Sequence, residues 1–324
     1  MRAITMKTFG SPDVLELTEE PDPKVTPART LVNVTRAGVN YADIHVRNDT
    51  YLAPVAMPYI PGNEVVGVTE DGRRIAGLVQ GGGYAQKAAV RNNQCWEIPD
   101  SIDDDQAIAV ALQGNTAYHL LFSQLQIRAN ETVLIPAAAG GVGSLAVQLA
   151  AANGTKVVAM ASTEEKRQLA LDLGAKAVVD SSTEEDLAQR ITAAAQEANG
   201  NRRDGINAAL EMTGGSTFAT TLDVIQRNGR VATFGYASGV WPSLKTEDLL
   251  QTLLKKSVTL SGFWLPNVDA THQAFSTKSL FTMITQGQLQ IINGGTYALS
   301  DAAQAHRDLA GRTVTGKLSL DPSQ

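Results

Sequence analysis

The sequence predicts an α/β protein that combines a doubly wound parallel sheet with a separate β-rich domain. From Glu131 to Phe234, short apolar segments alternate with amphipathic ones, which is the pattern of parallel βαβ units. A glycine-rich turn joins the first apolar segment to the first amphipathic one. The first 114 residues instead hold short β-type runs separated by glycine and proline, with little helical periodicity before Asp105.

The elements of the parallel sheet follow one another in chain order. The predicted strands are 132–135, 156–160, 178–179, 206–212 and 230–235. The first helix is expected over 144–152, where Asn153 and Gly154 end it. Ser162 to Glu165 and Ser182 to Glu185 both have the pattern of a capping box, in which the serine and glutamate side chains satisfy open backbone donors. We therefore expect helices that run from these two sites to Gly174 and to about Gly200.

Composition excludes several classes of protein. The 324 residues carry 27 Lys and Arg against 33 Asp and Glu, and this net charge of −6 is opposite in sign to that of a nucleic-acid binder. The single cysteine, Cys95, excludes an intramolecular disulfide and is expected to be a buried apolar thiol. The uncharged stretch 132–155 is too interrupted by proline and glycine to cross a membrane. With no signal-peptide core near Met1, we expect a cytoplasmic protein.

The most informative segment is the turn between the first strand and the first helix. Gly140, Gly141 and Gly143 allow the backbone to approach a pyrophosphate, and the first turn of the helix offers free N–H groups and a positive dipole end. Ala138 stands where the dinucleotide-binding fingerprint has its first glycine. The segment therefore predicts a dinucleotide site, with a purely structural turn as the alternative.

The residues after the second strand indicate which dinucleotide binds. NAD-selective sites place a carboxylate there for the ribose hydroxyls, whereas this chain has Ser162 and Thr163, followed by Lys166 and Arg167. A cation beside a 2′-phosphate contributes roughly 1.5–3 kcal/mol, so we predict NADPH. The alternative is that Lys166 and Arg167 only form solvated ion pairs with the neighbouring glutamates.

With these motifs the chain resembles the zinc-independent quinone oxidoreductase (zeta-crystallin-like) branch of the medium-chain dehydrogenase/reductase superfamily, over nearly its whole length. The motifs that carry the resemblance are 37–43 (AGVNYAD), 59–64 (YIPGNE), 83–85 (GYA), 137–143 (AAAGGVG), 229–235 (GRVATFG), 262–265 (GFWL) and 315–317 (TGK). The resemblance implies a chaperonin-10 (GroES)-like catalytic domain of residues 1–114 and 267–324. It also implies a Rossmann dinucleotide-binding domain of residues 115–266, with the active site in a cleft between the two domains.

The resemblance also implies which residues bind the cofactor and which line the acceptor. Asn40, Asp43 and Tyr51 are expected on the nicotinamide side, with Tyr51 either beside an acceptor oxygen or an ordinary loop tyrosine. Family members often have tyrosine at His45, which is either a proton donor here or a structural histidine. The expected cofactor-binding residues are Thr116, Ala138, Gly140, Gly141, Val142, Gly143, Ser162, Thr163, Lys166, Phe234, Gly235, Phe263, Trp264 and Lys317.

No metal site is expected. The zinc alcohol dehydrogenases of the superfamily carry metal-binding Cys and His where this chain has Asn40 and Asn63, and a neutral amide is a poor zinc ligand. Ala42 stands where those enzymes place the hydroxyl that begins their proton relay. The four histidines are too scattered along the chain to suggest another site.

The function expected from the resemblance is hydride transfer from NADPH to a quinone or an α,β-unsaturated carbonyl. Two alternatives stay open, a reductase of trans-2-enoyl thioesters and a non-catalytic NADPH-binding protein. Tyr41, Tyr236, Trp241 and Trp264 either form an aromatic wall for a flat substrate or belong to a core or interface. The β-rich stretch 257–263 is the expected edge strand through which two chains form a homodimer.

Overall fold

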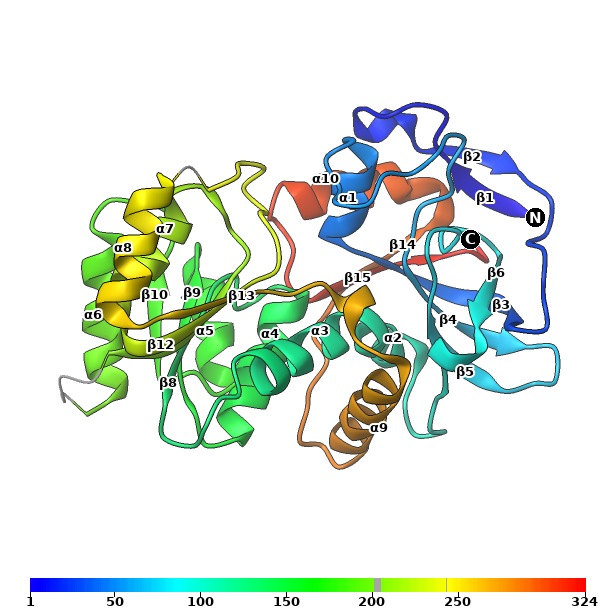
Figure 1. Cartoon of the computed structure of the whole chain (residues 1–324). Helices are drawn as coiled ribbons and strands as arrows, with labels where there is room; N and C mark the ends of the chain where they lie inside the picture. The colour runs from blue at the N-terminus through cyan, green and yellow to red at the C-terminus, as the bar shows by residue number, and fades with distance from the viewer. Residues whose placement is uncertain (201–204, 243) are drawn as a thin grey trace. The chain divides into compact units, whose positions relative to one another are not determined.

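The structure, a computed structural model, describes residues 1–200, 205–242 and 244–324. The chain forms two compact units (Figure 1). The first unit comprises Met1–Asn115 and Val268–Gln324, and the second comprises Thr116–Asn267.

The second unit contains a six-stranded parallel sheet, which confirms the predicted doubly wound fold. Its strand order is β10-β9-β8-β11-β12-β13. The chain therefore adds β9 and β10 on one side of β8 and then crosses over to add β11, β12 and β13 on the other side. The strands are β8 (Thr132–Ile135), β9 (Lys156–Ala161), β10 (Ala177–Asp180), β11 (Ile206–Glu211), β12 (Ile225–Thr233) and β13 (Thr259–Gly262). The helices are α4 (Gly141–Ala152), α5 (Glu164–Asp172), α6 (Leu187–Ala198), α7 (Gly215–Val224) and α8 (Thr246–Lys256).

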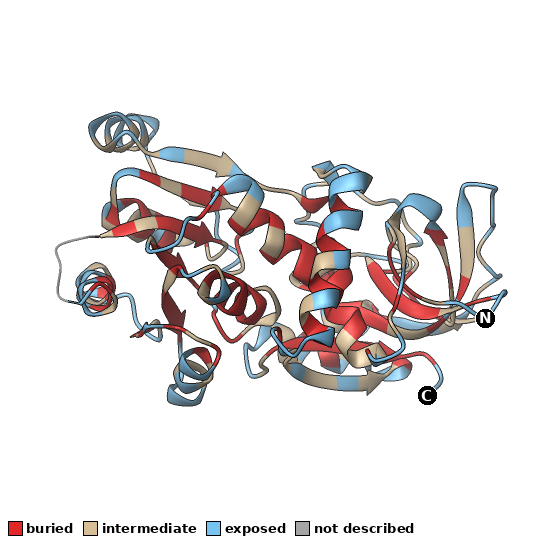
Figure 2. Cartoon of the chain, turned by 90° about the horizontal axis from the view of Figure 1, so that it is seen from below, coloured by how far each residue is buried: buried red, intermediate tan, exposed pale blue. Residues whose placement is uncertain are grey.

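Burial explains why the strands of this sheet are apolar throughout rather than alternating. All four residues of β8 are buried, and Leu134 packs in one cluster with Val158 of β9 and Ala209 of β11. Both faces of a central parallel strand are covered, so both sets of side chains must be apolar. Burying one valine or leucine side chain stabilises the fold by roughly 1.5–3 kcal/mol. Figure 2 shows the buried residues concentrated in the sheets and in the helices against them.

Both predicted capping boxes are wrong at the residue level. Helix α5 is capped by Thr163, one residue after the predicted Ser162, and the Thr163 hydroxyl accepts from the main-chain N–H of Lys166 at 3.3 Å. Helix α6 begins at Leu187 behind Asp186, a left-handed residue with φ 51° whose side chain does not cap the helix. The main-chain N–H of Ser182 instead donates to the side chain of Asp180.

The first unit is built on a seven-stranded sheet and a separate two-stranded one. The long path of the large sheet is β14-β15-β3-β4-β5-β7, with β6 paired to β3. Its strands are β3 (Arg29–Val39), β4 (Glu64–Thr69), β5 (Arg74–Leu78), β6 (Lys87–Arg91), β7 (Cys95–Glu97), β14 (Asn293–Ala298) and β15 (Lys317–Asp321), and the small sheet pairs β1 (Arg2–Thr5) with β2 (Glu16–Glu19). The C-terminal strand β15 thus pairs with β3, at Leu318 opposite Val39.

Helices of the first unit include one that the sequence did not suggest. Helix α1 (Tyr41–Arg47) has only seven residues, and four of them are buried, including the charged Asp43 and Arg47. Such a short helix shows no amphipathic period. The other helical segments are α2 (Asp104–Ala109), a π-helical turn η3 (Val110–Gly114), α3 (Asn115–Tyr118), which ends in the second unit, α9 (Ala270–Thr285) and α10 (Ala302–Ala310).

No helix in the described part of the chain is both long and apolar enough to cross a lipid bilayer.

Candidate active site

In the second unit, the glycine turn has the geometry of an anion site. The main-chain N–H of Gly140 donates to Ala137 O at 2.8 Å, and the residue Ala137 has a left-handed φ of 47°. A Cβ on Gly143 would lie 2.1 Å from Ala137 O, so no larger residue fits there without movement of the turn. Helix α4 then begins behind Gly140 with no side chain that caps it.

This turn fits the diphosphate of a dinucleotide. The first N–H groups of a helix have no partner within the helix, and a side-chain cap would normally occupy one of them. Gly140 cannot supply such a cap, so the helix end, with its positive dipole, is left for an anion. The main-chain N–H of Ala138 donates to Met160 O at 3.0 Å, which fixes the turn to strand β9.

The end of β9 holds the residues expected at the 2′-phosphate. Ser162 and Thr163 are exposed, and Lys166 is half-buried. Arg167 forms ion pairs with Glu164 at 2.7 Å and with Asp180 at 3.1 Å. The alternative stated above, that these cations only form ion pairs with neighbouring acidic residues, therefore describes Arg167. Lys166 lies on the same turn of α5.

Loops at the ends of β11 and β12 are fixed by a carboxylate that the sequence analysis missed. Glu211 is fully buried, and it accepts hydrogen bonds from the main-chain N–H groups of Thr213 (2.8 Å) and Gly214 (2.9 Å) and from the Thr221 hydroxyl (2.9 Å). Burial raises the pKa of Glu211, against the effect of these donors. The only signal in the sequence is an acidic residue at the end of an apolar strand.

Several predicted cofactor residues meet at one edge of this sheet. Phe234 follows β12, and its N–H donates to Glu211 O at 3.0 Å; the N–H of Phe263, which follows β13, donates to Thr233 O at 2.8 Å. Because the strands are parallel, these residues and the glycine turn all lie at the carboxyl edge, where open α/β sheets bind their ligands. Beyond Gly235, the rings of Tyr236 and Trp241 stack at 4.0 Å, and Trp241 is 58% exposed.

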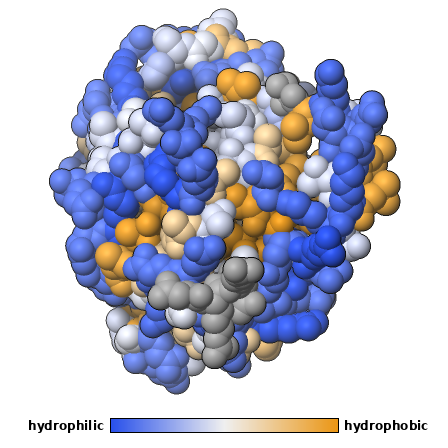
Figure 3. Space-filling model, turned by 90° about the vertical axis from the view of Figure 1, so that its left-hand side faces the viewer, coloured by the Kyte–Doolittle hydropathy of each residue, from blue (hydrophilic) through white to orange (hydrophobic). Residues whose placement is uncertain are grey.

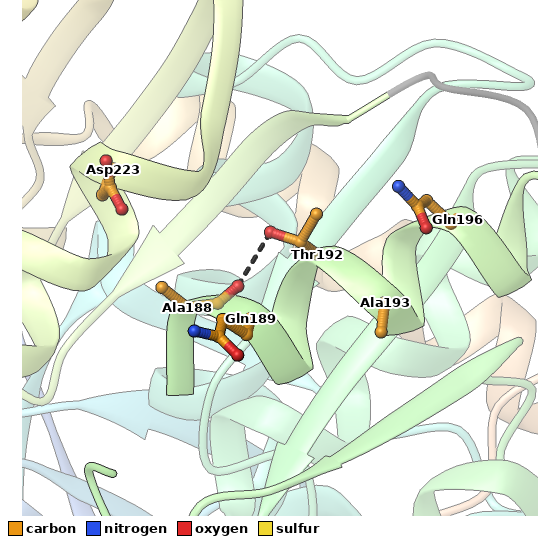
Figure 4. A pocket seen from close by; sticks show the side chains of 6 residues that line it. All are labelled: Ala188, Gln189, Thr192, Ala193, Gln196 and Asp223. Atoms are coloured by element: carbon orange, nitrogen blue, oxygen red, sulfur yellow. Dashed lines mark hydrogen bonds between the residues drawn. The ribbon is translucent and has the colours of Figure 1, made fainter. Parts of the chain in front are cut away.

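The pocket shown in Figure 4 lies elsewhere on this unit. Its lining residues come from α6 and the end of α7, and they are Ala188, Gln189, Thr192, Ala193, Gln196 and Asp223. The Thr192 hydroxyl donates to the main-chain oxygen of Ala188. None of the predicted site residues lines this pocket.

In the first unit, Asn40 connects two buried polar groups. Its side-chain Nδ2 donates to Glu64 Oε1 at 2.8 Å, and its Oδ1 accepts from Lys317 Nζ at 3.1 Å and from Gln113 Nε2 at 3.0 Å. Lys317 and Glu64 form an ion pair with 2% and 0% of their side chains exposed. Lys317, predicted as a cofactor contact, thus has its ammonium group engaged inside this unit.

Asp43 lies on the other side of Asn40. Its Oδ2 accepts from the main-chain N–H of Asn40 at 2.8 Å and from the Tyr84 hydroxyl at 3.1 Å, and its Oδ1 accepts from Asn63 Nδ2 at 2.8 Å. Burial raises the pKa of Asp43 to about 6, although the donors around it act in the opposite direction. At neutral pH the carboxylate is therefore ionised and held by three donors.

The chain of hydrogen bonds continues from Tyr84 to His306 and Arg47. The chemistry of these groups determines which one donates in each hydrogen bond. Arg47 Nη1 lies 3.2 Å from His306 Nδ1 and can only donate, so Nδ1 is an acceptor and the imidazole is neutral. His306 Nε2–H then donates to the Tyr84 oxygen at 3.0 Å, which leaves the Tyr84 hydroxyl to donate to Asp43. Burial and then the charge of Arg47 lower the pKa of His306 to about 3.

The other predicted catalytic residues are His45 and Tyr51, and Thr116 is a predicted cofactor contact. His45 on α1 has its Nδ1 3.1 Å from the Thr50 hydroxyl, and burial lowers its pKa. Tyr51 is half-buried and packs against the hydrophobic core of the first unit. Thr116 is the first residue of the second unit and is buried. The catalytic roles of His45 and Tyr51 stay predictions.

No group of three or more His, Cys, Asp or Glu side chains in the described ranges is arranged to hold a metal ion. The two positions that correspond to zinc ligands in the alcohol dehydrogenases carry the amides of Asn40 and Asn63. Both amides are occupied by hydrogen bonds to carboxylates. Cys95 is a free, half-buried thiol whose pKa is raised by burial, as expected of a structural cysteine.

Comparison with known proteins gives the family. Residues 26–77 match the family model described as the alcohol dehydrogenase GroES-like domain, and residues 141–279 match the one described as zinc-binding dehydrogenase. A protein of Schizosaccharomyces pombe named probable quinone oxidoreductase is 32% identical over 98% of this chain and 96% of its own length. The quinone oxidoreductase of Pseudomonas aeruginosa is 31% identical over 99% of both chains. This chain belongs to the quinone oxidoreductase branch of the medium-chain dehydrogenase/reductase superfamily.

Solved structures of related proteins agree with this assignment. Mycobacterial Rv1454c complexed with NADPH is 31% identical, with a TM-score of 0.91 over 99% of this chain and all of its own. The Escherichia coli quinone oxidoreductase complexed with NADPH is 28% identical, with the same TM-score and coverage. The family resemblance and the GroES-like and Rossmann folds expected of this quinone oxidoreductase family member are confirmed.

Proposed function

We propose that this protein is an NADPH-dependent reductase that transfers a hydride to a quinone or an α,β-unsaturated carbonyl without a zinc ion. The observation that carries the proposal is the uncapped start of α4 behind a turn where Gly143 has no room for a side chain. The relatives named quinone oxidoreductases, and the two related structures solved with NADPH, support the same conclusion. We assign the cofactor to residues 115–266 and the acceptor to residues 1–114 and 267–324.

The residues of the second unit suit the parts of the cofactor in order. The backbone of Gly140, Gly141, Val142 and Gly143 would hold the diphosphate, and Ser162, Thr163 and Lys166 would hold the 2′-phosphate. When bound, the nicotinamide supplies a hydride. Further contacts are assigned to Thr116, Ala138, Phe234, Gly235, Phe263 and Trp264, but not to Lys317, whose ammonium group is engaged with Glu64 and Asn40 in the first unit.

The residues of the first unit orient the acceptor and manage its proton. Asp43 cannot act as a free acid, because three donors hold its carboxylate, so we assign it the role of fixing Asn40. Tyr51 and His45 are the side chains we assign to proton donation toward the reduced acceptor. If His45→Ala and Tyr51→Phe both leave turnover unchanged from pH 6 to 8, solvent supplies the proton and this assignment fails.

The loss of NADPH absorbance with a panel of acceptors tests the function. We expect oxidation with a quinone and with a small enone, and none with an enoyl-CoA. Oxidation of NADPH with enoyl-CoA as the only effective acceptor would establish the thioester reductase instead, and tight NADPH binding with no turnover of any acceptor would contradict catalysis. Equal affinity for NADH and NADPH in a fluorescence titration would contradict the assigned 2′-phosphate site.

We also propose a homodimer formed through β13. This strand lies at one end of the six-stranded sheet, so its outer backbone groups have no neighbouring strand within the described part of the unit. Helix α8 lies on the face shown in Figure 3, where apolar and hydrophilic surfaces alternate, and its Leu250 and Leu254 are 51% and 78% exposed. A monomeric mass by light scattering at micromolar concentration would contradict the dimer.

A cytoplasmic location stays a prediction, supported by the single cysteine.

A further inference from the structure

We propose that Gln113 recognises a hydroxyl group of the bound reaction product. Its side-chain oxygen, Oε1, is a buried hydrogen-bond acceptor with no partner among residues 1–200, 205–242 and 244–324. Gln113 belongs to the first unit and is 8% exposed. The inference deepens the proposed function and rests on it, because it concerns the acceptor that this function reduces.

The orientation of the Gln113 amide is determined by its neighbours. Lys317 can only donate and the Glu64 carboxylate can only accept, so Asn40 must turn Oδ1 to Lys317 and Nδ2 to Glu64. Asn40 Oδ1 in turn requires a donor from Gln113, and Gln113 Nε2 lies 3.0 Å from it. If the Gln113 amide were rotated by half a turn, its Oε1 would face Asn40 Oδ1, and two hydrogen-bond acceptors would lie next to each other. Its Oε1 is therefore directed away from Asn40.

The local fold maintains this unusual arrangement. Gln113 lies in the π-helical turn η3, and such turns occur often at functional sites. The buried side chain of Asn115 donates to the main-chain oxygens of Val110 (3.2 Å) and Ala111 (3.0 Å), and it also donates to the Thr277 hydroxyl (2.8 Å). These bonds satisfy carbonyls of the π-helical turn and fix it to α9. Buried polar atoms are almost always paired, so the single unpaired oxygen points to a missing donor.

An amide oxygen selects ligands by the donor that they carry. A quinone offers only acceptor oxygens, whereas the hydroquinone formed from it carries two O–H groups. Gln113 is held by its Nε2 against Asn40 in the predicted acceptor site, and its Oε1 would bind such a hydroxyl and would gain nothing from the carbonyl that precedes it. The ligand class is therefore a hydroxyarene, the chemical form of the reduced acceptor.

The experiment compares 1-naphthol with 1-methoxynaphthalene, which share a ring system but differ in the hydroxyl donor. Both are titrated against the protein saturated with NADP⁺, with tryptophan fluorescence as the readout. We expect the wild type to bind naphthol about 10-fold more tightly, the factor that one hydrogen bond of about 1.4 kcal/mol gives. Gln113→Met keeps the side-chain length without the acceptor, and it should bind both compounds equally.

Gln273→Met is the matched control. Gln273 is also a fully buried glutamine of the first unit, but both ends of its amide are paired, to Val268 O at 3.0 Å and to Gln94 Nε2 at 3.1 Å. It should retain the preference for naphthol. The ratio of two affinities within one variant does not depend on its folded fraction, so partial unfolding does not obscure the result.

Two results would overturn the inference. Equal affinities in the wild type would show that no hydroxyl is recognised, and a preference that survives in Gln113→Met would assign the recognition to another residue. In either case Gln113 Oε1 would belong to a buried water. Because the readout is binding, failure of this inference is distinguishable from failure of NADPH oxidation, which is measured separately with the acceptor panel.

Discussion

At the scale of single residues, four charged side chains lie buried near Asn40 and their charges cancel. Asp43 and Glu64 are balanced by Arg47 and Lys317, and all four are at most 5% exposed. A buried charge without a partner costs several kcal/mol, so each member depends on the others. His306 stays neutral because burial lowers its pKa and because Arg47 donates to the nitrogen that would take a proton. The network therefore holds Asn40 rigidly in place. Because every hydrogen bond from Arg47 through His306 and Tyr84 donates toward Asp43, a proton cannot pass back along it from Asp43 to Arg47.

The Tyr84 hydroxyl is the link of this network that a conservative mutation removes most cleanly. Tyr84→Phe leaves His306 Nε2–H without its acceptor and removes one donor from Asp43. We expect a loss of about 2 kcal/mol in the free energy of unfolding by urea, since each buried polar group left unpaired costs 1–3 kcal/mol. Tyr41→Phe, which removes one hydrogen bond to Leu309 O, is the control and should cost less than half as much.

The pKa values of Asp43 and His306 predict a specific pH dependence. Asp43 has its folded pKa raised to about 6, so its contribution to stability is present below the unfolded pKa of 3.8 and is lost as pH rises through 6. His306 has its folded pKa lowered to about 3, so its contribution is present above 6.5 and is lost as pH falls toward 3. Between pH 4 and 6 the two effects have opposite signs and cancel.

Asp43→Asn removes the carboxyl group of residue 43. Of the two opposing contributions to the pH dependence of stability, only that of His306 then remains. Relative to the wild type, we expect the free energy of unfolding of this variant to fall by about 1.4 kcal/mol for each pH unit from 6 to 4. Urea unfolding at pH 4, 5 and 6 measures the slope, which is independent of the absolute cost of the substitution. Parallel pH profiles for the two proteins would show that Asp43 does not have a pKa of about 6 in the folded protein.

At the scale of elements, the glycine turn combines two requirements in one short segment. Ala137 adopts a left-handed conformation, and its carbonyl oxygen then occupies the space where a side chain of Gly143 would lie. The start of α4 has no covering side chain because its N-cap residue is Gly140. The proposed diphosphate site and the tight packing are therefore features of the same short segment.

Gly143→Ala tests this element. The added Cβ would lie 2.1 Å from Ala137 O, so the turn must shift, and we expect NADPH affinity by fluorescence titration to fall at least 10-fold. Gly262→Ala is the control, because a Cβ there meets no atom within 4 Å. Unchanged NADPH affinity in Gly143→Ala would place the diphosphate away from this turn.

Elements of the second unit were predictable because their signals are local. Five parallel strands follow from apolar runs, and the glycine turn from its position between a strand and a helix. The helix caps were predicted less well, because Ser162 and Thr163 are both able to cap and the structure uses Thr163. Helix α1 is too short and too buried to have a periodic pattern.

At the scale of the whole molecule, the candidate site of the first unit depends on contacts between residues far apart in the chain. Asn40 and Asp43 follow from the family motif, but Gln113 reaches Asn40 across 73 positions of sequence and His306 reaches Arg47 across 259, and nothing local marks Gln113 or His306. Glu64 and Lys317 lie in recognised motifs, yet their ion pair is visible only in the folded sheet. Sequence alone therefore predicted the motif residues Asn40 and Asp43 and left out the residues that hold them.

The proposed dimer is tested at the outer edge of the sheet. Thr259 on β13 is exposed, and Thr259→Lys places a charge on the strand that would pair with its copy, a device by which natural edge strands avoid association. We expect the mass by light scattering to fall from twice that of one chain to that of one chain, with NADPH affinity unchanged. A dimer that persists in this variant would assign the interface to another surface.

The position of β15 has a consequence for biosynthesis. This strand, residues 317–321, sits between β14 and β3, so the large sheet of the first unit lacks an interior member until the final few residues of that strand have emerged from the ribosome. The second unit is encoded by one continuous segment and can fold while translation is still under way. A nascent chain arrested before residue 317 should thus have a folded second unit, while the large sheet of the first unit still lacks β15.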